Sequence, residues 1–133
     1  MERIVVPAKT DYLDQVTAFV DERLEARGCP MSAQMQIELA VEEIFVNIAN
    51  YAYGDSIGKA KISIENNNRE ITIVFTDSGT PYNPLEKEDP DITLSAEERQ
   101  IGGLGIFLTK KNMDSVSYEY KDNQNVFTMK KSY

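Results

Sequence analysis

LAVEEIFVNIANYAY, at residues 39–53, places an acid and an amide on a stretch with helical periodicity. Apolar residues recur every three or four positions through and just before it, which predicts an amphipathic helix with one buried stripe. The stripe consists of Ile37, Val41, Ile44 and Ile48. Glu43 and Asn47 are four residues apart, so they share a helix face at the margin of the stripe. Their oxygens suit proton transfer and hard metal ions, although such a pair is also typical of a solvated surface.

A second motif, DSGTPYNP at residues 77–84, directly follows a stretch that alternates apolar and polar residues like a strand. The Asp77 carboxylate at the strand end is suited to accept a hydrogen bond from an adenine amino group, as carboxylates do from other exocyclic amines. Gly79 would let a flat base approach the backbone. The alternative is an ordinary Asp-Ser-Gly turn, which has no need of a ligand.

The third motif is Gly102-Gly103-Leu104-Gly105, which leads into a helix expected from Ile106 to about Met113. Glycines let backbone amides crowd a phosphate, and a helix N-terminus adds favourable partial charge. No Gly-Lys-Ser/Thr follows, so this is not a Walker loop, and its late position before a hairpin disfavours a dinucleotide fingerprint. A glycine-rich hinge is the alternative interpretation.

The rest of the chain predicts one α+β domain over residues 1–133. A short strand, a helix capped by Thr10 or Asp11 and ending near Gly28, and the longer helix from Pro30 to about Tyr53 precede two hairpins. The hairpin strands are expected at 60–64, 71–75, 116–120 and 126–130, with turns at 66–68 and 122–123. Strands linked by hairpins favour a mostly antiparallel, mixed sheet with the helices on one face, that is, a two-layer sandwich.

Composition excludes several classes of function. The net charge is −8, which disfavours direct binding to nucleic acid or to an anionic membrane. The chain has no histidine, so a Ser-His-Asp triad, a histidine metal site and a phosphoacceptor histidine are all excluded. Cys29 is the single cysteine, no apolar stretch is long enough to span a membrane, and the N-terminus lacks a secretory pattern. We therefore expect a cytoplasmic protein.

Taken together and in this order, the three motifs resemble those of the Bergerat-fold ATPases, and most of all those of the anti-sigma factor serine/threonine kinases. Residues 39–53 are similar to the N-box of that family, residues 77–84 to its adenine-binding box, and residues 102–114 to its second glycine box. The resemblance covers essentially the whole chain. It implies the histidine-kinase-like ATP-binding fold, with ATP and Mg²⁺ as cofactors.

The resemblance also assigns roles to single residues. Glu43 would be the general base, Asn47 the ligand of a Mg²⁺ that bridges the phosphates, and Asp77 the partner of the adenine amino group. Arg99, at the end of an acidic stretch that would close over ATP, would reach the terminal phosphate. The remaining nucleotide-binding positions implied by the motifs are Asn50, Gly79, Tyr82, Gly102, Gly103, Leu104, Gly105 and Thr109.

Three features depart from the family pattern or leave a choice. Ile48 and Tyr51 stand where the family often has a small residue and a histidine. Glu42 precedes Glu43 and is an alternative base, although the spacing to Asn47 favours Glu43. The stretch before Arg99 is rich in acidic residues, which is unfavourable beside phosphates unless it stays outside the site.

The resemblance implies a kinase that phosphorylates a serine of an anti-anti-sigma partner and alternately binds a sigma factor. The alternative is an ATP-dependent switch that holds a partner with little or no phosphotransfer. A sensor kinase catalytic domain is disfavoured, because the chain has neither a histidine nor dimerisation helices. The resemblance leaves a homodimer open.

Overall fold

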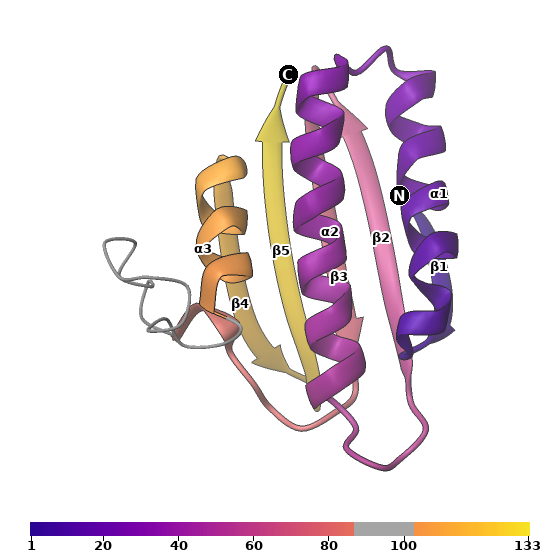
Figure 1. The fold of residues 1–133 in the computed structure, drawn as a ribbon, viewed down its shortest axis with the longest axis vertical. Helices are drawn as coiled ribbons and strands as arrows, with labels where there is room; N and C mark the ends of the chain where they lie inside the picture. The colour runs from indigo at the N-terminus through magenta and orange to yellow at the C-terminus, as the bar shows by residue number, and fades with distance from the viewer. Residues whose placement is uncertain (87–102) are drawn as a thin grey trace.

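A computed structural model describes residues 1–86 and 103–133, in which helices cover one face of a five-stranded sheet (Figure 1). This confirms the predicted α+β two-layer architecture. The elements are β1 (Glu2–Pro7), α1 (Leu13–Ala26), α2 (Met31–Tyr51), β2 (Lys59–Asn67), β3 (Glu70–Asp77), α3 (Gly103–Asn112), β4 (Ser115–Lys121) and β5 (Gln124–Ser132), with short 3₁₀ turns at Thr10–Tyr12 and Pro84–Glu86. None of the described helices is long and apolar enough to cross a membrane.

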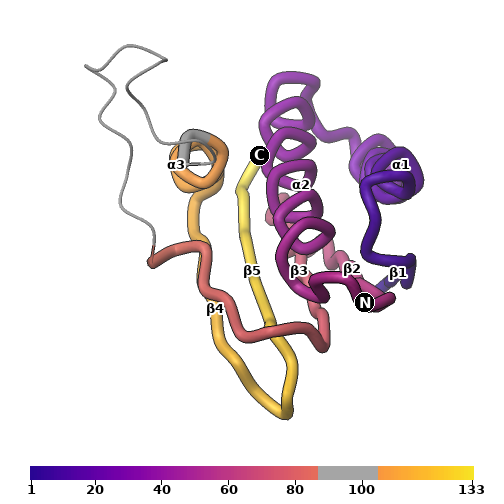
Figure 2. The backbone as a smooth tube through the Cα atoms, turned by 60° about the horizontal axis from the view of Figure 1, so that its bottom comes forward, coloured from indigo at the N-terminus to yellow at the C-terminus, as the bar shows by residue number. Residues whose placement is uncertain are grey.

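The strand order across the sheet is β1-β2-β3-β5-β4, and all of these pairs are antiparallel. The closing hairpin therefore inserts β5 beside β3 and leaves β4 at the edge. In the β3–β5 register, Asp77 faces Asn125 across the two strands. Figure 2 shows α1, α2 and α3 together on one side of the sheet. The C-terminal end of β3 and the start of β5 therefore lie side by side, and the loop after β3 contacts the end of α2.

The core lies between the helices and the inner face of the sheet. The predicted α2 stripe is buried along its whole length, as are the inward-facing residues of β2, β3 and β5. Because side chains of a strand alternate between its two faces, the row Ile71, Ile73 and Phe75 continues to Asp77. The alternation that builds the core thus also delivers a carboxylate to the helix-facing side of the sheet.

Local boundaries differ from the sequence expectation in two places. The first hairpin turns at Asn68 and Arg69, with φ of 51° and 65°, and not at residues 66–68, because Asn66 and Asn67 continue the β2 ladder. A two-residue turn with positive φ at both positions matches the twist of the flanking strands. Similarly, α3 begins at Gly103, three residues before the predicted start at Ile106.

The start of the first helix also corrects the expectation. Neither Thr10 nor Asp11 caps α1 with its side chain; both lie in the 3₁₀ turn that precedes the helix. The backbone N–H of Tyr12 donates to the carbonyl of Lys9 at 3.0 Å, so the backbone itself closes the first turn.

The packing of α1 against α2 encloses a group of carboxyl side chains. The buried amide of Gln34 donates from Nε2 to Glu25 Oε1 at 3.3 Å and to Glu38 Oε1 at 3.4 Å. Burial, together with a hydrogen bond to Glu38 and the negative charge of Glu38, raises the pKa of the adjacent Asp21 to about 6. The folded state therefore holds a proton on Asp21 more tightly than the unfolded state does.

We predict that Asp21→Asn raises the thermal stability of the protein at pH 7.5. The folded pKa of about 6 exceeds the ordinary value of 3.8, so the free energy of unfolding of the wild-type protein falls as the pH rises through this interval. The variant has no carboxyl at this position and does not lose this stability. Thermal melts between pH 4 and 8 measure the difference, which is expected to shrink toward pH 4.

Asp14→Asn, at an exposed position of the same helix, serves as the matched control and is expected to show no such pH-dependent gain. A constant offset between Asp21→Asn and wild type from pH 4 to 8 would contradict the assignment to Asp21.

Candidate functional site

The Asp77 side chain is buried at the end of β3, with 5% of the residue exposed. Its Oδ1 accepts hydrogen bonds from the Gly79 N–H and from Asn125 Nδ2, both at 2.9 Å. The first of these bonds is the Asp-Ser-Gly turn considered from the sequence. The second comes from the opposite strand, so Asp77 is held from two directions and is not merely a turn residue.

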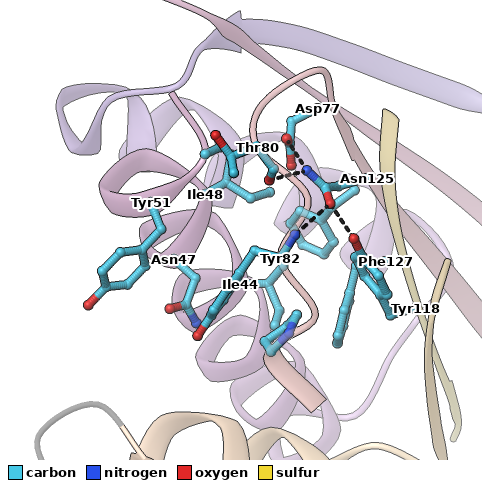
Figure 3. Close-up of a pocket in the computed structure, with 13 residues that line it drawn as sticks. Ile44, Asn47, Ile48, Tyr51, Asp77, Thr80, Tyr82, Tyr118, Asn125 and Phe127 are labelled. Atoms are coloured by element: carbon cyan, nitrogen blue, oxygen red, sulfur yellow. Dashed lines mark hydrogen bonds between the residues drawn. The ribbon is translucent and has the colours of Figure 1, made fainter. Parts of the chain in front are cut away.

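Asn125 is a buried polar junction between β5, β4 and the loop that follows β3 (Figure 3). Its Nδ2 donates to Asp77 Oδ1 and to the carbonyl of Thr80 at 3.0 Å. Its Oδ1 accepts from the Tyr82 N–H at 3.1 Å and from the Tyr118 hydroxyl. A side-chain amide has two donor hydrogens and two acceptor lone pairs, so every one of them is used here.

Burial raises the pKa of Tyr118 above its ordinary value, and the charges of Asp77 and Glu86 raise it further. The phenol of Tyr118 therefore keeps its proton at neutral pH and remains a hydrogen-bond donor to Asn125.

A mostly apolar pocket lies beside this junction, between the end of α2 and the inner face of the sheet. Its walls include Ile44, Asn47, Ile48, Tyr51, Phe75, Asp77, Thr80, Tyr82, Tyr118, Asn125 and Phe127. An apolar cavity with a few convergent polar groups is typical of a site for a small molecule or cofactor. Its free volume is about 30 Å³, room for about two waters, so an aromatic ring enters only if the pocket widens.

Two tyrosines stand at this pocket, one on α2 and one on the loop. The rings of Tyr51 and Tyr82 are 5.8 Å apart, centroid to centroid, and tilted by 37°. Tyr51 is the last residue of α2 and is exposed. The loop that carries Tyr82 is therefore in contact with α2 through an aromatic pair.

Glu43 and Asn47 connect the pocket to a second cavity. Asn47 Nδ2 donates to Glu43 Oε1 at 3.1 Å, as expected for residues four apart on one helix face. Asn47 lines the pocket that contains Asp77, whereas Glu43 lines a groove of about 280 Å³ between α2 and α3. Glu42 also borders the groove, but it is exposed, whereas Glu43 is half-buried.

Two of the predicted glycines have packing roles. A Cβ on Gly79 would overlap the backbone carbonyl of Ala52, at the end of α2. A Cβ on Gly105 would overlap the carboxyl group of Glu43. The missing side chains therefore allow the β3 loop to approach α2 and allow Glu43 to lie against the first turn of α3.

The other predicted nucleotide-binding residues have different locations. Asn50 is exposed on α2 and does not line the pocket with Asn47. Thr109 lines the α2–α3 groove, but its hydroxyl donates to the carbonyl of Gly105 at 2.9 Å. Gly103 and Leu104 are the first two residues of α3. Arg99, Gly102 and most of the acidic stretch lie outside the described residues.

The sequence model of the histidine kinase-like ATPase domain matches residues 6–131 of this chain. The chain belongs to this family. Its relatives include the serine/threonine-protein kinase BtrW of Bordetella bronchiseptica, 27% identical over 70% of this chain and 66% of BtrW. The serine-protein kinase RsbW of Listeria monocytogenes is 25% identical over 94% of this chain and 83% of RsbW. RsbW of Bacillus thuringiensis is 23% identical, over 94% and 81%.

A solved structure shows the same fold. The catalytic domain of histidine kinase ThkA, in a nucleotide-free form, superposes with a TM-score of 0.55 and 19% sequence identity. The superposition covers 99% of this chain and 97% of that domain. The histidine kinase-like architecture of the described residues therefore includes the closing hairpin that carries Asn125.

The donor set of this ATPase domain is compatible with magnesium at Asn47. Because Asn47 Nδ2 donates to Glu43, the side chain is turned so that its hard oxygen, Oδ1, is the atom left for a ligand at the pocket. Mg²⁺ prefers oxygen ligands and keeps several waters, so one protein oxygen together with phosphate oxygens is a sufficient set.

Neither Asn125 nor Tyr118 was among the predicted site residues. Strand alternation could have identified Asn125, because Met129 and Phe127 face the helices and Asn125 is the next residue in that row. A polar residue in an otherwise apolar inward row was the available signal. Its partner Asp77 was not readable from the sequence, because that contact depends on β5 pairing with β3.

We predict unequal losses of stability when a methyl group is added at the two glycines. Gly79→Ala places the methyl against the Ala52 carbonyl, which is backbone and cannot rotate away, so we expect a loss of about 1–3 kcal/mol of stability. Gly105→Ala meets the end of a flexible side chain, so we expect a smaller loss while Glu43 is displaced. Urea denaturation of both variants measures the contrast; equal losses would refute it.

Proposed function

We propose that this protein is an ATP-binding anti-sigma regulatory factor with serine-protein kinase activity toward an anti-anti-sigma partner. One observation carries the proposal: the Glu43–Asn47 hydrogen bond joins an apolar pocket containing Asp77 to a groove at the first turn of α3. The base ring would lie in the pocket, and the polyphosphate and the substrate hydroxyl would lie beside it at the groove. Relatives named serine-protein kinases, aligned along most of the chain, support the same activity.

In the proposed complex, the pocket widens to admit the adenine. Its amino group faces Asp77, Gly79 lies nearby, and Tyr82 lies at the mouth. The phosphates extend toward the N-terminal turn of α3, where the amides of Gly103, Leu104 and Gly105 favour negative charge. Asn47 Oδ1 would be the protein ligand of Mg²⁺, which neutralises charge on the phosphates when bound. Asn50, Thr109, Gly102 and Arg99 remain proposed contacts.

Glu43 is the proposed general base. It is half-buried, borders the open α2–α3 groove and is oriented by Asn47. A serine hydroxyl that comes within about 3 Å can pass its proton to Glu43 while its oxygen attacks the γ-phosphorus and ADP leaves. Among the described residues, no hydrogen bond orients the Glu42 side chain as Asn47 orients Glu43. The geometry therefore supports Glu43 as the general base.

The proposal includes a cytoplasmic location, alternate binding of a sigma factor and the anti-anti-sigma substrate, and no direct contact with nucleic acid or membrane. The proposal allows a homodimer but does not require one. An ATP-dependent switch with little phosphotransfer is the competing function, and the next experiment distinguishes it.

We predict that Glu43→Gln abolishes phosphotransfer but retains nucleotide binding, because the amide cannot accept the serine proton. The measurement is transfer of radiolabel from ATP, with Mg²⁺, to a purified anti-anti-sigma partner. Glu42→Gln is the matched control and should keep most of the activity. Loss in Glu42→Gln alone would make Glu42 the base, and binding without transfer in wild type would favour the switch.

We predict that Asp77→Asn weakens ATP binding by about tenfold to a hundredfold. The amide replaces a charged acceptor of the adenine amino group, and hydrogen bonds to charged groups contribute roughly 1.5–3 kcal/mol. Isothermal calorimetry with Mg²⁺-ATP measures the change, and Asp55→Asn, at an exposed position after α2, is the control. Unchanged affinity in Asp77→Asn would remove the adenine from this pocket.

A further inference from the structure

The hydrogen bonds at Asp77 are unevenly divided between its two oxygens. Both bonds that it accepts from the described residues, from Gly79 N–H and Asn125 Nδ2, go to Oδ1. Oδ2 accepts none from those residues, and Asp77 lines the pocket. The carboxylate is thus fixed with one oxygen occupied by the protein and the other left for a ligand.

The orientation of Asn125 is determined by its partners. The Asp77 carboxylate and the Thr80 carbonyl can only accept, so they must face Nδ2; the Tyr82 N–H can only donate, so it must face Oδ1. An amide turned by 180° would oppose like groups at each of these contacts. The Tyr118 phenol, which remains protonated, donates the second bond to Oδ1.

We propose that Asn125 is a positioning residue that fixes the Asp77 carboxylate and the loop from Thr80 to Tyr82, and that this fixation determines selectivity for purines with a 6-amino group. The inference rests on the proposed ATP binding. It assigns to Asn125 a role that acts through Asp77 and not through contact with the reacting phosphate.

The selectivity follows from what the fixed carboxylate can and cannot do. An ionised carboxylate presents acceptors only, and its bonds from Asn125 and Gly79 hold Oδ1, so that Oδ2 is kept in one position for the base. An adenine amino group donates to it. A purine with hydrogen at position 6 leaves this buried acceptor unsatisfied, and a 6-keto purine places a second acceptor against it; both arrangements are unfavourable.

The test compares the binding of two nucleotides to the full chain by calorimetry. Mg²⁺-ATP and the triphosphate of purine riboside differ only in the 6-amino group. Wild-type protein is expected to prefer ATP by about tenfold or more, since one hydrogen bond to a charged group is at stake. In Asn125→Ala and in the isosteric Asn125→Asp, which turns a donor toward Asp77 into an acceptor, the preference is expected to fall to about twofold or less.

A control variant separates positioning from general loss of structure. Gln124→Ala removes a 3.3 Å bond from the neighbouring residue of β5 to Ser78 Oγ and should keep the wild-type preference. Thermal melts identify variants that do not fold, and Asn125→Asp, which keeps the size of the side chain, provides a second comparison if Asn125→Ala does not fold.

The outcomes are distinct. Equal weakening of both nucleotides in the Asn125 variants, with the ATP preference intact, would make Asn125 a purely structural residue and overturn the inference. A wild-type protein that binds ATP without preferring it would overturn the inference but keep the proposed function. A wild-type protein that binds neither nucleotide would instead defeat the proposed function itself.

Discussion

The contact between Asp77 and Asn125 is the constraint on which the rest of the site depends. It exists because β5 pairs with β3 in a register that sets these two inward-facing polar residues opposite each other. Nearby backbone bonds add to it: Thr80 N–H donates to the Ala52 carbonyl at 2.7 Å, and Ser78 N–H donates to the Tyr53 hydroxyl at 2.8 Å. These bonds hold the start of the loop after β3 against the end of α2.

This arrangement separates two chemical environments that share one helix. Toward the sheet, α2 presents Ile44, Ile48 and Asn47 to a pocket that is apolar except at the Asp77 junction. Toward α3, the same helix presents Glu43 to an open groove. Because residues four apart on a helix lie one turn from each other, a single hydrogen bond connects the two environments. Recognition of a base and proton transfer can thus be carried out by adjacent turns of one element.

Much of this was readable from residue pattern alone. The apolar stripe of α2, the strand alternation and the hairpin turn at residues 122–123 predicted the two-layer α+β fold, because each reflects a local preference. Glu43 and Asn47 were predictable as neighbours because helix geometry fixes their spacing. The Asn125 contact with Asp77 was not, since these residues are separated by more than one element and strand order is a property of the whole sheet. The close approaches at Gly79 and Gly105 likewise depend on how α2 lies against the loop and α3.

The insertion of β5 between β3 and β4 has a consequence for how ligand and folding are coupled. The pocket cannot form from residues that are close together in the sequence alone. Its inner wall and the Asp77–Asn125 contact form only when β5 is paired with both β3 and β4. A molecule bound there would favour only chains in which the central strands are paired, and so it would act against global unfolding rather than against fraying of one loop. Slow hydrogen exchange of the β3 and β5 amides would then record nucleotide occupancy, although the ligand touches few of those residues.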